Sequence, residues 1–214
     1  MKQKIALFGG TGQTGSEFLR LALAEGYKVR LLARNPDKLK ISHSNLEVLK
    51  GDVLNPTDVN NTVQGCNVVV SLFGHVKGSP DWLQTEGTQN IAEAMKRASV
   101  EKIISLSGGG LPYPEKDQPK FIDKFIRGVM RLLVPKILHD AVKHHQVLAK
   151  SSLKWVIVRA PRLTNGKQVG TYKVSWVGVN SGTQISRADL ADFIVKQVES
   201  NTFLYQMPFV SYAN

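Results

Sequence analysis

The sequence of 214 residues predicts a single-domain α/β fold, with a Rossmann-like, doubly wound parallel sheet and helices on both of its faces. Three observations lead to this prediction. Short apolar runs alternate with segments of helical periodicity. Most of the runs are apolar at almost every position, as is typical of parallel strands that are buried on both sides. The first run leads directly into a glycine-rich turn and a helix, and no linker or repeat divides the chain, so we expect one domain over residues 1–214.

The predicted strands and helices follow one another in alternation, and each crossover between parallel strands is expected to be right-handed. The strands are predicted at residues 5–8, 27–33, 46–49, 68–73, 102–106 and 155–158. The helices are predicted at residues 12–25, 57–64, 85–98 and 187–198. Gly26 follows the first helix at the position where glycine commonly ends a helix. Ser186, with Asp189 three residues later, resembles a capping box at the start of the last helix.

The composition excludes several classes of protein. A chain with 42% hydrophobic and 21% charged residues is typical of a folded globular protein. Cys66 is the only cysteine, which excludes a disulfide scaffold and a cysteine-rich metal site, and the histidines form no convincing ligand spacing, so no metal is expected. No apolar run approaches the roughly 18 residues of a membrane span. The first residues do not resemble a signal peptide, and we expect a cytoplasmic protein.

Most of the positive charge lies in one part of the chain. The net charge is +11, and the segment from Lys120 to Lys173 contains twelve basic and two acidic residues. Such a concentration of charge attracts phosphorylated cofactors, acidic substrates, anionic lipid or nucleic acid. A solvated surface that keeps the protein soluble is the simpler interpretation. Nucleic acid is disfavoured, because no recognition motif and no row of exposed aromatic residues accompanies the charge.

Residues 112–138 interrupt the alternation of strands and helices. Two stripes at helical spacing run through this segment. The apolar stripe is formed by Phe121, Ile122, Phe125, Ile126, Val129, Leu132 and Leu133, and the basic stripe by Lys120, Lys124, Arg127 and Arg131. An amphipathic helix most often packs its apolar stripe on its own core, and this is the expectation here. The alternative is a peripheral contact with an anionic membrane surface or with a protein partner.

Residues 9–15, Gly-Gly-Thr-Gly-Gln-Thr-Gly, carry the clearest functional signal. They contain the pattern G-x-G-x-x-G at Gly10, Gly12 and Gly15, directly after a strand and before a helix. Glycine permits the tight turn, brings backbone N–H groups close to a pyrophosphate and lets the helix approach the strand. The N-terminus of the helix offers free donors and the positive end of a dipole. The turn therefore predicts a bound dinucleotide.

The type of dinucleotide is predicted from the end of the second strand. A site for NAD usually has an acidic residue there, which binds the ribose 2′-hydroxyl. This sequence has Arg34 instead, with Lys38 four residues later. Arginine forms charge-assisted hydrogen bonds with a phosphate. We therefore predict NADP(H) as the cofactor, the alternative being a surface arginine with no role in binding.

Several motifs give the sequence a resemblance to a known family. They are Thr-Gly-Gln-Thr-Gly at 11–15, Gly-Asp-Val-Leu at 51–54, Glu-Gly-Thr-Gln-Asn-Ile at 86–91, Ser-Ser-Leu-Lys-Trp at 151–155 and Ile-Ser-Arg-Ala-Asp-Leu-Ala at 185–191. The chain resembles the atypical short-chain dehydrogenases/reductases, in the NAD(P)H-binding, NmrA-like set, and within it the group similar to biliverdin-IXβ reductase (flavin reductase). The resemblance covers most of the chain. It departs at residues 112–138, where this sequence is longer and where the segment is expected to border the substrate side.

The resemblance implies a cofactor site at the carboxyl ends of the strands. It implies that the phosphates are lined by Gly9, Thr11, Gly12, Gln13, Thr14 and Gly15. It further places Arg34 and Lys38 at the 2′-phosphate, Asp52 and Val53 at the adenine, Phe73, Gly74 and His75 at the ribose, and Ser107 and Pro161 near the nicotinamide.

The catalytic motif of typical short-chain dehydrogenases, Tyr-x-x-x-Lys, is absent, because none of the five tyrosines is followed by lysine four residues later. We therefore expect NADPH-dependent hydride transfer to a small conjugated molecule, such as a flavin, a quinone or a linear tetrapyrrole. Ser107 is the candidate for a polar contact with this acceptor, unless its hydroxyl serves the turn at 108–110. The resemblance makes His145 a candidate proton relay. The alternative function is a non-catalytic, NADP(H)-binding redox sensor or tethering protein.

Overall fold

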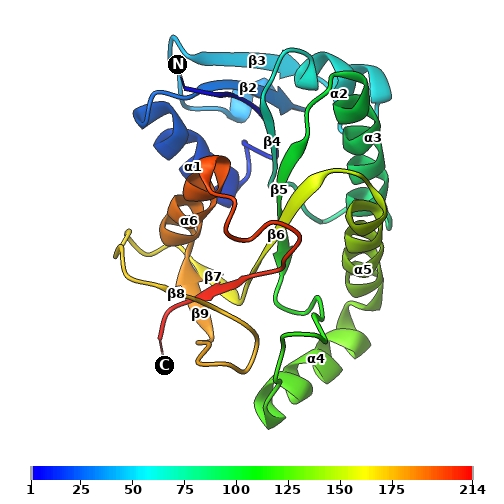
Figure 1. Cartoon of the computed structure of the whole chain (residues 1–214), viewed down its shortest axis with the longest axis vertical. Helices are drawn as coiled ribbons and strands as arrows, with labels where there is room; N and C mark the ends of the chain where they lie inside the picture. The colour runs from blue at the N-terminus through cyan, green and yellow to red at the C-terminus, as the bar shows by residue number, and fades with distance from the viewer. Residues whose placement is uncertain (1, 214) are drawn as a thin grey trace.

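The computed structural model describes residues 2–213, and in this part of the chain a central sheet lies between two layers of helices (Figure 1). The strands are β1 (Lys4–Phe8), β2 (Lys28–Ala33), β3 (Leu46–Lys50), β4 (Val68–Ser71), β5 (Lys102–Gly108), β6 (Lys154–Ala160), β7 (Arg162–Thr164), β8 (Lys173–Ser175), β9 (Gln184–Ser186) and β10 (Phe209–Ser211). The main sheet has eight strands in the order β3-β2-β1-β4-β5-β6-β10-β8. Neighbours from β3 to β10 are parallel, and β8 is antiparallel to β10.

The helices cover both faces of this sheet. They are α1 (Gln13–Ala24), α2 (Pro56–Val63), α3 (Leu83–Arg97), α4 (Phe121–Leu133), α5 (Pro135–Lys150) and α6 (Arg187–Glu199), with a short 3-10 helix, η1, at Pro36–Lys38. In Figure 1, α1 and α6 lie on one side of the sheet, and α2, α3 and α5 lie on the other. The predicted doubly wound α/β fold is confirmed, and all six predicted strands and all four predicted helices are present.

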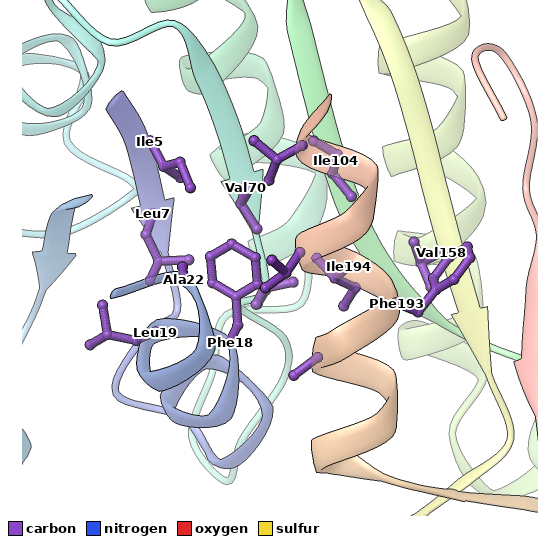
Figure 2. Packing of buried hydrophobic residues seen from close by; sticks show 14 of the residues in the cluster. Ile5, Leu7, Phe18, Leu19, Ala22, Val70, Ile104, Val158, Phe193 and Ile194 are labelled. Atoms are coloured by element: carbon purple, nitrogen blue, oxygen red, sulfur yellow. The ribbon is translucent and has the colours of Figure 1, made fainter. Parts of the chain in front are cut away.

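Packing on both faces of the sheet explains why the strands are continuous apolar runs. Successive side chains of a strand point to opposite faces. Leu7 of β1 therefore packs with Phe18 of α1 and Ile194 of α6, as Figure 2 shows. The next residue, Phe8, points to the opposite face and belongs to the same cluster as Ile91 of α3.

The predicted cap at the start of α6 is present. The backbone N–H of Asp189 donates to Ser186 Oγ at 3.0 Å, and Ser186 Oγ lies 2.8 Å from a carboxylate oxygen of Asp189. The same carboxylate also accepts hydrogen bonds from the backbone N–H groups of Val169 and Gly170 and from the hydroxyl of Tyr212. A single acidic side chain thus connects the start of the helix to the loop before β8 and to Tyr212, the residue after the last strand.

Four short strands near the C-terminus were not predicted. β7 and β9 form a separate two-stranded sheet, while β8 and β10 extend the main sheet beyond β6. Each of these strands has three residues, which is too short for a periodic pattern to show. The antiparallel pairing of β8 corrects the prediction of a wholly parallel sheet. A smaller correction is that β4 ends at Ser71, although the prediction extended this strand to residue 73.

The prediction for residues 112–138 also needs correction. The segment contains a stretch without regular structure, the whole of α4 and the start of α5, and Val134 separates the two helices. The apolar stripe does not pack on the core, because no residue of α4 is buried. In Figure 1, α4 lies at one end of the molecule, beyond the edge where β5 ends. None of the helices within residues 2–213 has both the length and the apolar character that crossing a bilayer requires.

Candidate functional site

The carboxyl ends of neighbouring parallel strands bring most of the predicted site residues to one edge of the sheet. β1 ends before Gly9, β2 before Arg34, and β6 before Pro161, while Ser107 is the last residue but one of β5. The strand order reverses between β1 and β4, because β2 and β3 follow on one side and β5 and β6 on the other. Ligands of open α/β sheets bind at the carboxyl edge beside this reversal.

The turn between β1 and α1 has no room for a side chain at two of its glycines. Gly9 has a φ of +83°, and a Cβ atom there would lie 2.6 Å from the carbonyl carbon of Leu72. A Cβ atom on Gly15 would lie 2.8 Å from the Cα of Gly10. These close approaches hold the start of α1 against the ends of β1 and β4. In a turn of this kind, the absence of side chains also lets a ligand approach the backbone closely.

The start of α1 keeps its backbone donors available. Gly12 precedes the helix, no side chain caps the first turn, and the first turn contains no acidic residue. Thr11, Gly12 and Gln13 are exposed, whereas Thr14 is buried. Free N–H groups at the positive end of a helix dipole bind phosphate groups well. The residues of this turn therefore fit the pyrophosphate of a dinucleotide.

A cavity of about 350 Å³ beside the glycine turn is lined by cations. Thr11 of the turn borders it, together with Arg34, Lys38 and Lys77. Within residues 2–213, none of these three cations forms an ion pair. Positive charge without a counter-ion suits a phosphate group. Lys77, in the loop after β4, was missed by sequence reasoning, since only the fold brings it beside β2.

Val53 and Phe73, which the resemblance placed near the adenine and the ribose, lie together on α3. A Cβ atom on Gly87 would lie 2.7 Å from Cζ of Phe73 and 3.1 Å from Cγ2 of Val53, so glycine leaves room for both side chains. Asp52 shapes the loop that carries Val53, because its carboxylate accepts a hydrogen bond from the backbone N–H of Leu54 at 2.9 Å. The loop and the aromatic ring form an apolar wall at the sheet edge.

His75 is held by a carboxylate from another layer of the fold. Its Nε2 lies 2.6 Å from Oδ2 of Asp140, a fully buried residue of α5. The same carboxylate accepts hydrogen bonds from the backbone N–H groups of Gln84 and Thr85, at 2.8 and 2.9 Å, and from the Thr85 hydroxyl. Because these groups belong to the first turn of α3, the charge lies at the positive end of that helix. The contacts connect the loop after β4 to two helices.

Sequence reasoning did not identify Asp140 as part of this site. A signal was present, because the buried residues of α5 are Asp140, Ala141, His144 and Leu148, which repeat at helical spacing. An acidic residue in such a buried stripe is unusual, since a charge is rarely buried without partners. The identity of the partners was not predictable, because they come from segments more than fifty residues away.

Ser107 has a buried side chain whose hydroxyl has no hydrogen-bond partner among the described residues. Because buried hydroxyl groups are nearly always paired, this exception indicates that Ser107 Oγ is available to bind a ligand at the sheet edge. Two residues earlier, Ser105 Oγ lies 2.9 Å from Nε2 of His144. Burial lowers the pKa of His144 to about 4, so that its imidazole is neutral near pH 7.

The structure does not bring His145 to the other predicted site residues. The His145 ring packs on Trp155, with 5.5 Å between the ring centroids. Trp155 is the second residue of β6, near the amino edge, whereas Ser107 and Pro161 lie at the carboxyl edge. Burial lowers the pKa of His145. This position does not suit the proton relay that was expected of His145, and the neighbouring His144 is the histidine that faces β5.

A second cavity, of about 460 Å³, lies between α4, α5 and the turn that follows Ser107. It is lined by Gly110, Pro112, Arg127, Arg131, Pro135, Leu138, His139 and Val142. Apolar side chains form much of its wall, and two arginines add positive charge. A cavity of this size and character fits a small molecule with an apolar body and an anionic group.

A buried ion pair fixes the chain beside the second cavity. The guanidinium of Arg159, on β6, donates two hydrogen bonds of 2.8 Å to the two oxygens of Asp117 and one to the carbonyl of Leu111. Arg159 is fully buried. Asp117 also accepts hydrogen bonds from the backbone N–H groups of Tyr113 and Val177. Residues 111–117 are therefore attached to the sheet, although they have no regular structure.

Comparison with known proteins identifies a matching family. A family model described as NAD(P)H-binding matches residues 9–201. Cinnamoyl-CoA reductase 1 of Petunia hybrida is 27% identical over 135 residues, which cover 57% of this chain. The same alignment covers 40% of the petunia protein, so the chain spans less than half the length of this relative.

Two solved structures have the same fold. A short-chain dehydrogenase/reductase from Veillonella parvula, in complex with NADP, has a TM-score of 0.80 and 19% identity, over 99% of this chain and 95% of that one. ChuY, an anaerobillin reductase from Escherichia coli O157:H7, has a TM-score of 0.78 and 19% identity, over 97% of this chain and 96% of the other. At such identities the similarity shows a shared fold.

Proposed function

The chain belongs to the NAD(P)H-binding family, and from this premise we propose that it is an NADPH-dependent reductase that transfers hydride to a small conjugated acceptor. Flavins, quinones and linear tetrapyrroles are acceptors of this kind. Membership of the family confirms the nicotinamide dinucleotide that the glycine turn predicted. The observation that carries the proposal is the continuity of the glycine turn with the cationic cavity at Arg34, Lys38 and Lys77.

The preference for NADPH rests on charge. NADPH differs from NADH by a 2′-phosphate, and a phosphate gains charge-assisted hydrogen bonds from arginine and lysine. Arg34 lies directly after β2, at the position where sites for NAD usually have an acidic residue. The complex of the Veillonella protein with NADP supports the same choice.

The acceptor is expected in the second cavity, whose wall includes Gly110, three residues after Ser107. When bound, the cofactor supplies a hydride, and the conjugated acceptor takes the accompanying proton from water. The unpartnered hydroxyl of Ser107 is then free to donate a hydrogen bond to a carbonyl oxygen of the acceptor. Arg131, in the wall of the cavity, would bind an anionic substituent. The side chains position the acceptor, which is their main contribution to the rate.

The first experiment is calorimetric titration with NADPH and with NADH, followed in the same sample by NADPH oxidation with FMN, a quinone or biliverdin. We expect NADPH to bind at least about tenfold more tightly than NADH, and we expect turnover with at least one acceptor. Failure to bind either dinucleotide would contradict the whole assignment. Binding without turnover on any acceptor would favour the alternative, a non-catalytic NADP(H)-binding sensor or tethering protein.

Two variants test the acceptor site. We expect Ser107→Ala to lower kcat about tenfold, because one hydrogen bond to the acceptor is lost, while the affinity for NADPH changes little. FMN and riboflavin share the same ring system and differ by a phosphate. We expect a lower KM for FMN than for riboflavin, and we expect Arg131→Ala to remove that difference. An unchanged difference would place the acceptor outside the second cavity.

A further inference from the structure

Helix α4 presents an apolar face to solvent. Its exposed apolar residues are Phe121, Ile122, Phe125, Ile126, Val129, Leu132 and Leu133. Phe121 is 85% exposed and Leu132 is 82% exposed. At 100° per residue, the seven side chains occupy an arc of about 140° around the helix. A continuous exposed apolar face of this kind marks an interaction site.

The opposite side of α4 attaches the helix to the rest of the molecule. The half-buried residues of the helix are Asp123, Arg127 and Met130. Arg127 lies 3.9 Å from the Asp117 carboxylate, and a Cβ atom on Gly110 would lie 3.1 Å from the Met130 side chain. The centre of this side is about 140° from the centre of the apolar face. The helix thus turns its apolar residues away from the core that would otherwise bury them.

The charge around the apolar face indicates what covers it. At 100° per residue, the exposed Lys124 and Lys120 lie about 60° and 100° beyond the edge of this face that Phe121 forms. They belong to the segment from Lys120 to Lys173, in which basic residues outnumber acidic ones by twelve to two. A second copy of the chain would bring the same positive charge to the contact, which disfavours self-association. Anionic headgroups of a bilayer are complementary to it.

The dimensions of α4 fit a helix that lies on a membrane surface. Its 13 residues give a length of about 20 Å, shorter than the roughly 30 Å of a bilayer core. A helix with a wide apolar face and basic residues on its polar side is typical of peripheral binding at the interface. α4 also lies at one end of the molecule in Figure 1, where a flat surface can reach it.

We propose that α4 attaches this protein to anionic membranes. Phe121, Phe125 and Leu132 would insert between the lipids, while the long side chain of Lys124 reaches the headgroups and Lys120 adds longer-range attraction. An exposed ridge inserts directly into a bilayer, whereas a protein partner would have to provide a matching groove. The proposal does not depend on the reductase activity, because the apolar face of α4 is separate from Arg127 and Arg131, which line the second cavity, and because the test uses neither cofactor nor acceptor.

The test is sedimentation of the full chain with vesicles of phosphatidylcholine alone or of phosphatidylcholine mixed with phosphatidylglycerol. We expect at least about tenfold stronger binding to the anionic vesicles at low salt, and a large loss of binding at high salt. Absence of binding to the anionic vesicles at low salt would overturn the proposal. If light scattering instead showed a dimer that Phe125→Ser dissociates, without lipid binding, the face would bind a second copy and the proposal would also fail.

Two pairs of variants assign the binding to α4. We expect Phe121→Ser with Phe125→Ser to reduce binding at least about tenfold, since two inserting side chains are lost. We expect Lys120→Glu with Lys124→Glu to have a similar effect. Lys28→Glu with Lys96→Glu is the matched control, because it makes the same change in net charge at exposed positions on β2 and α3. Equal loss in the control pair would show that total charge, and not α4, controls binding.

A gain of signal provides a check that does not depend on a loss of binding. Phe125→Trp places an indole on the apolar face, and Val169→Trp places one at an exposed position in the loop before β8. With brominated anionic lipids, we expect additional quenching of tryptophan fluorescence in Phe125→Trp but not in Val169→Trp, both relative to the unmodified chain. Equal quenching of the two variants would contradict insertion of α4.

Discussion

The carboxylate of Asp140 lies 2.6 Å from Nε2 of His75, and it also accepts hydrogen bonds from the backbone N–H groups of Gln84 and Thr85 in the first turn of α3. Asp140 belongs to α5, whereas His75 belongs to the loop after β4 that borders the candidate cofactor site. The packing of two helices on the sheet is therefore connected, through one buried carboxylate, to the edge at which the cofactor is expected. This connection motivates the first prediction.

Replacement of Asp140 by asparagine is expected to destabilise the fold. The NH2 group of Asn would face the backbone N–H of either Gln84 or Thr85, which donate to different oxygens of Asp140, and the charge at the start of α3 would be lost. The free energy of unfolding should fall by about 3 kcal/mol, measured by urea denaturation. His75→Ala is the matched comparison, because it removes one partner and leaves the helix contacts. His75→Ala should lower the free energy of unfolding by less than Asp140→Asn does. Equal effects would argue against stabilisation of the start of α3 by Asp140.

Replacement of Arg34 by alanine is expected to remove the preference for NADPH. A hydrogen bond to a charged group contributes about 1.5–3 kcal/mol, which corresponds to roughly a tenfold to hundredfold loss of affinity for NADPH. Affinity for NADH should not change, because NADH has no 2′-phosphate. Calorimetric titration measures both. Arg20→Ala serves as a control, since Arg20 is exposed on α1 and pairs with Glu17. A parallel loss of NADH binding would mean that Arg34 contacts another part of the dinucleotide.

A methyl group on Gly15 is expected to disrupt the phosphate turn. Its Cβ would overlap the backbone of Gly9 and Gly10, and overpacking of this kind costs about 1–3 kcal/mol. Thermal melting and NADPH titration of Gly15→Ala should both show the defect. Gly128→Ala provides the contrast, because no atom lies within 4 Å of the added carbon on α4. That variant should be equally or more stable, by up to about 1 kcal/mol, since alanine favours helix.

His144 is expected to make the protein less stable in mild acid. Burial lowers its pKa to about 4 in the folded chain, whereas the ordinary value is 6.5. Between these values the unfolded chain binds a proton that the folded chain does not, so stability decreases as the pH falls from 6.5 to 4. The full effect is about 3 kcal/mol. The free energy of unfolding, measured by denaturation at several pH values, should decrease toward pH 4 in the unmodified chain and in the exposed-site control His43→Gln. The decrease should be smaller in His144→Gln.

The ion pair of Arg159 and Asp117 is expected to contribute far more than an exposed one. Asp117→Asn would leave a buried guanidinium without its counter-charge, and such a change costs about 3–5 kcal/mol. Asp81→Asn breaks the exposed pair with Lys136 and should cost less than about 1 kcal/mol. Comparison of the two unfolding free energies checks the prediction. Proteolysis should also become faster within residues 111–117 of Asp117→Asn, because the ion pair holds this segment on the sheet.

Much of the fold and of the cofactor site was predictable because the relevant signals are local. Three parts of the cofactor site are consecutive in the chain: β1, the glycines that follow it, and the helix that begins at Gln13. Arg34 was identified for the same reason, since it directly follows β2. The cap at Ser186 and Asp189 needs only three residues of separation. In each case the physical cause acts between neighbours in the sequence.

The sequence by itself determined the alternation of six strands and four helices along the chain, the glycine turn and the concentration of basic residues from Lys120 to Lys173. Tertiary structure alone decided that Lys77 borders the same cavity as Arg34, that Asp140 meets His75, and that His145 packs on Trp155 away from the carboxyl edge. It also decided that the apolar stripe of α4 faces solvent. Periodicity defines the two faces of a helix, but the direction in which each face points depends on contacts between segments that are distant in the chain.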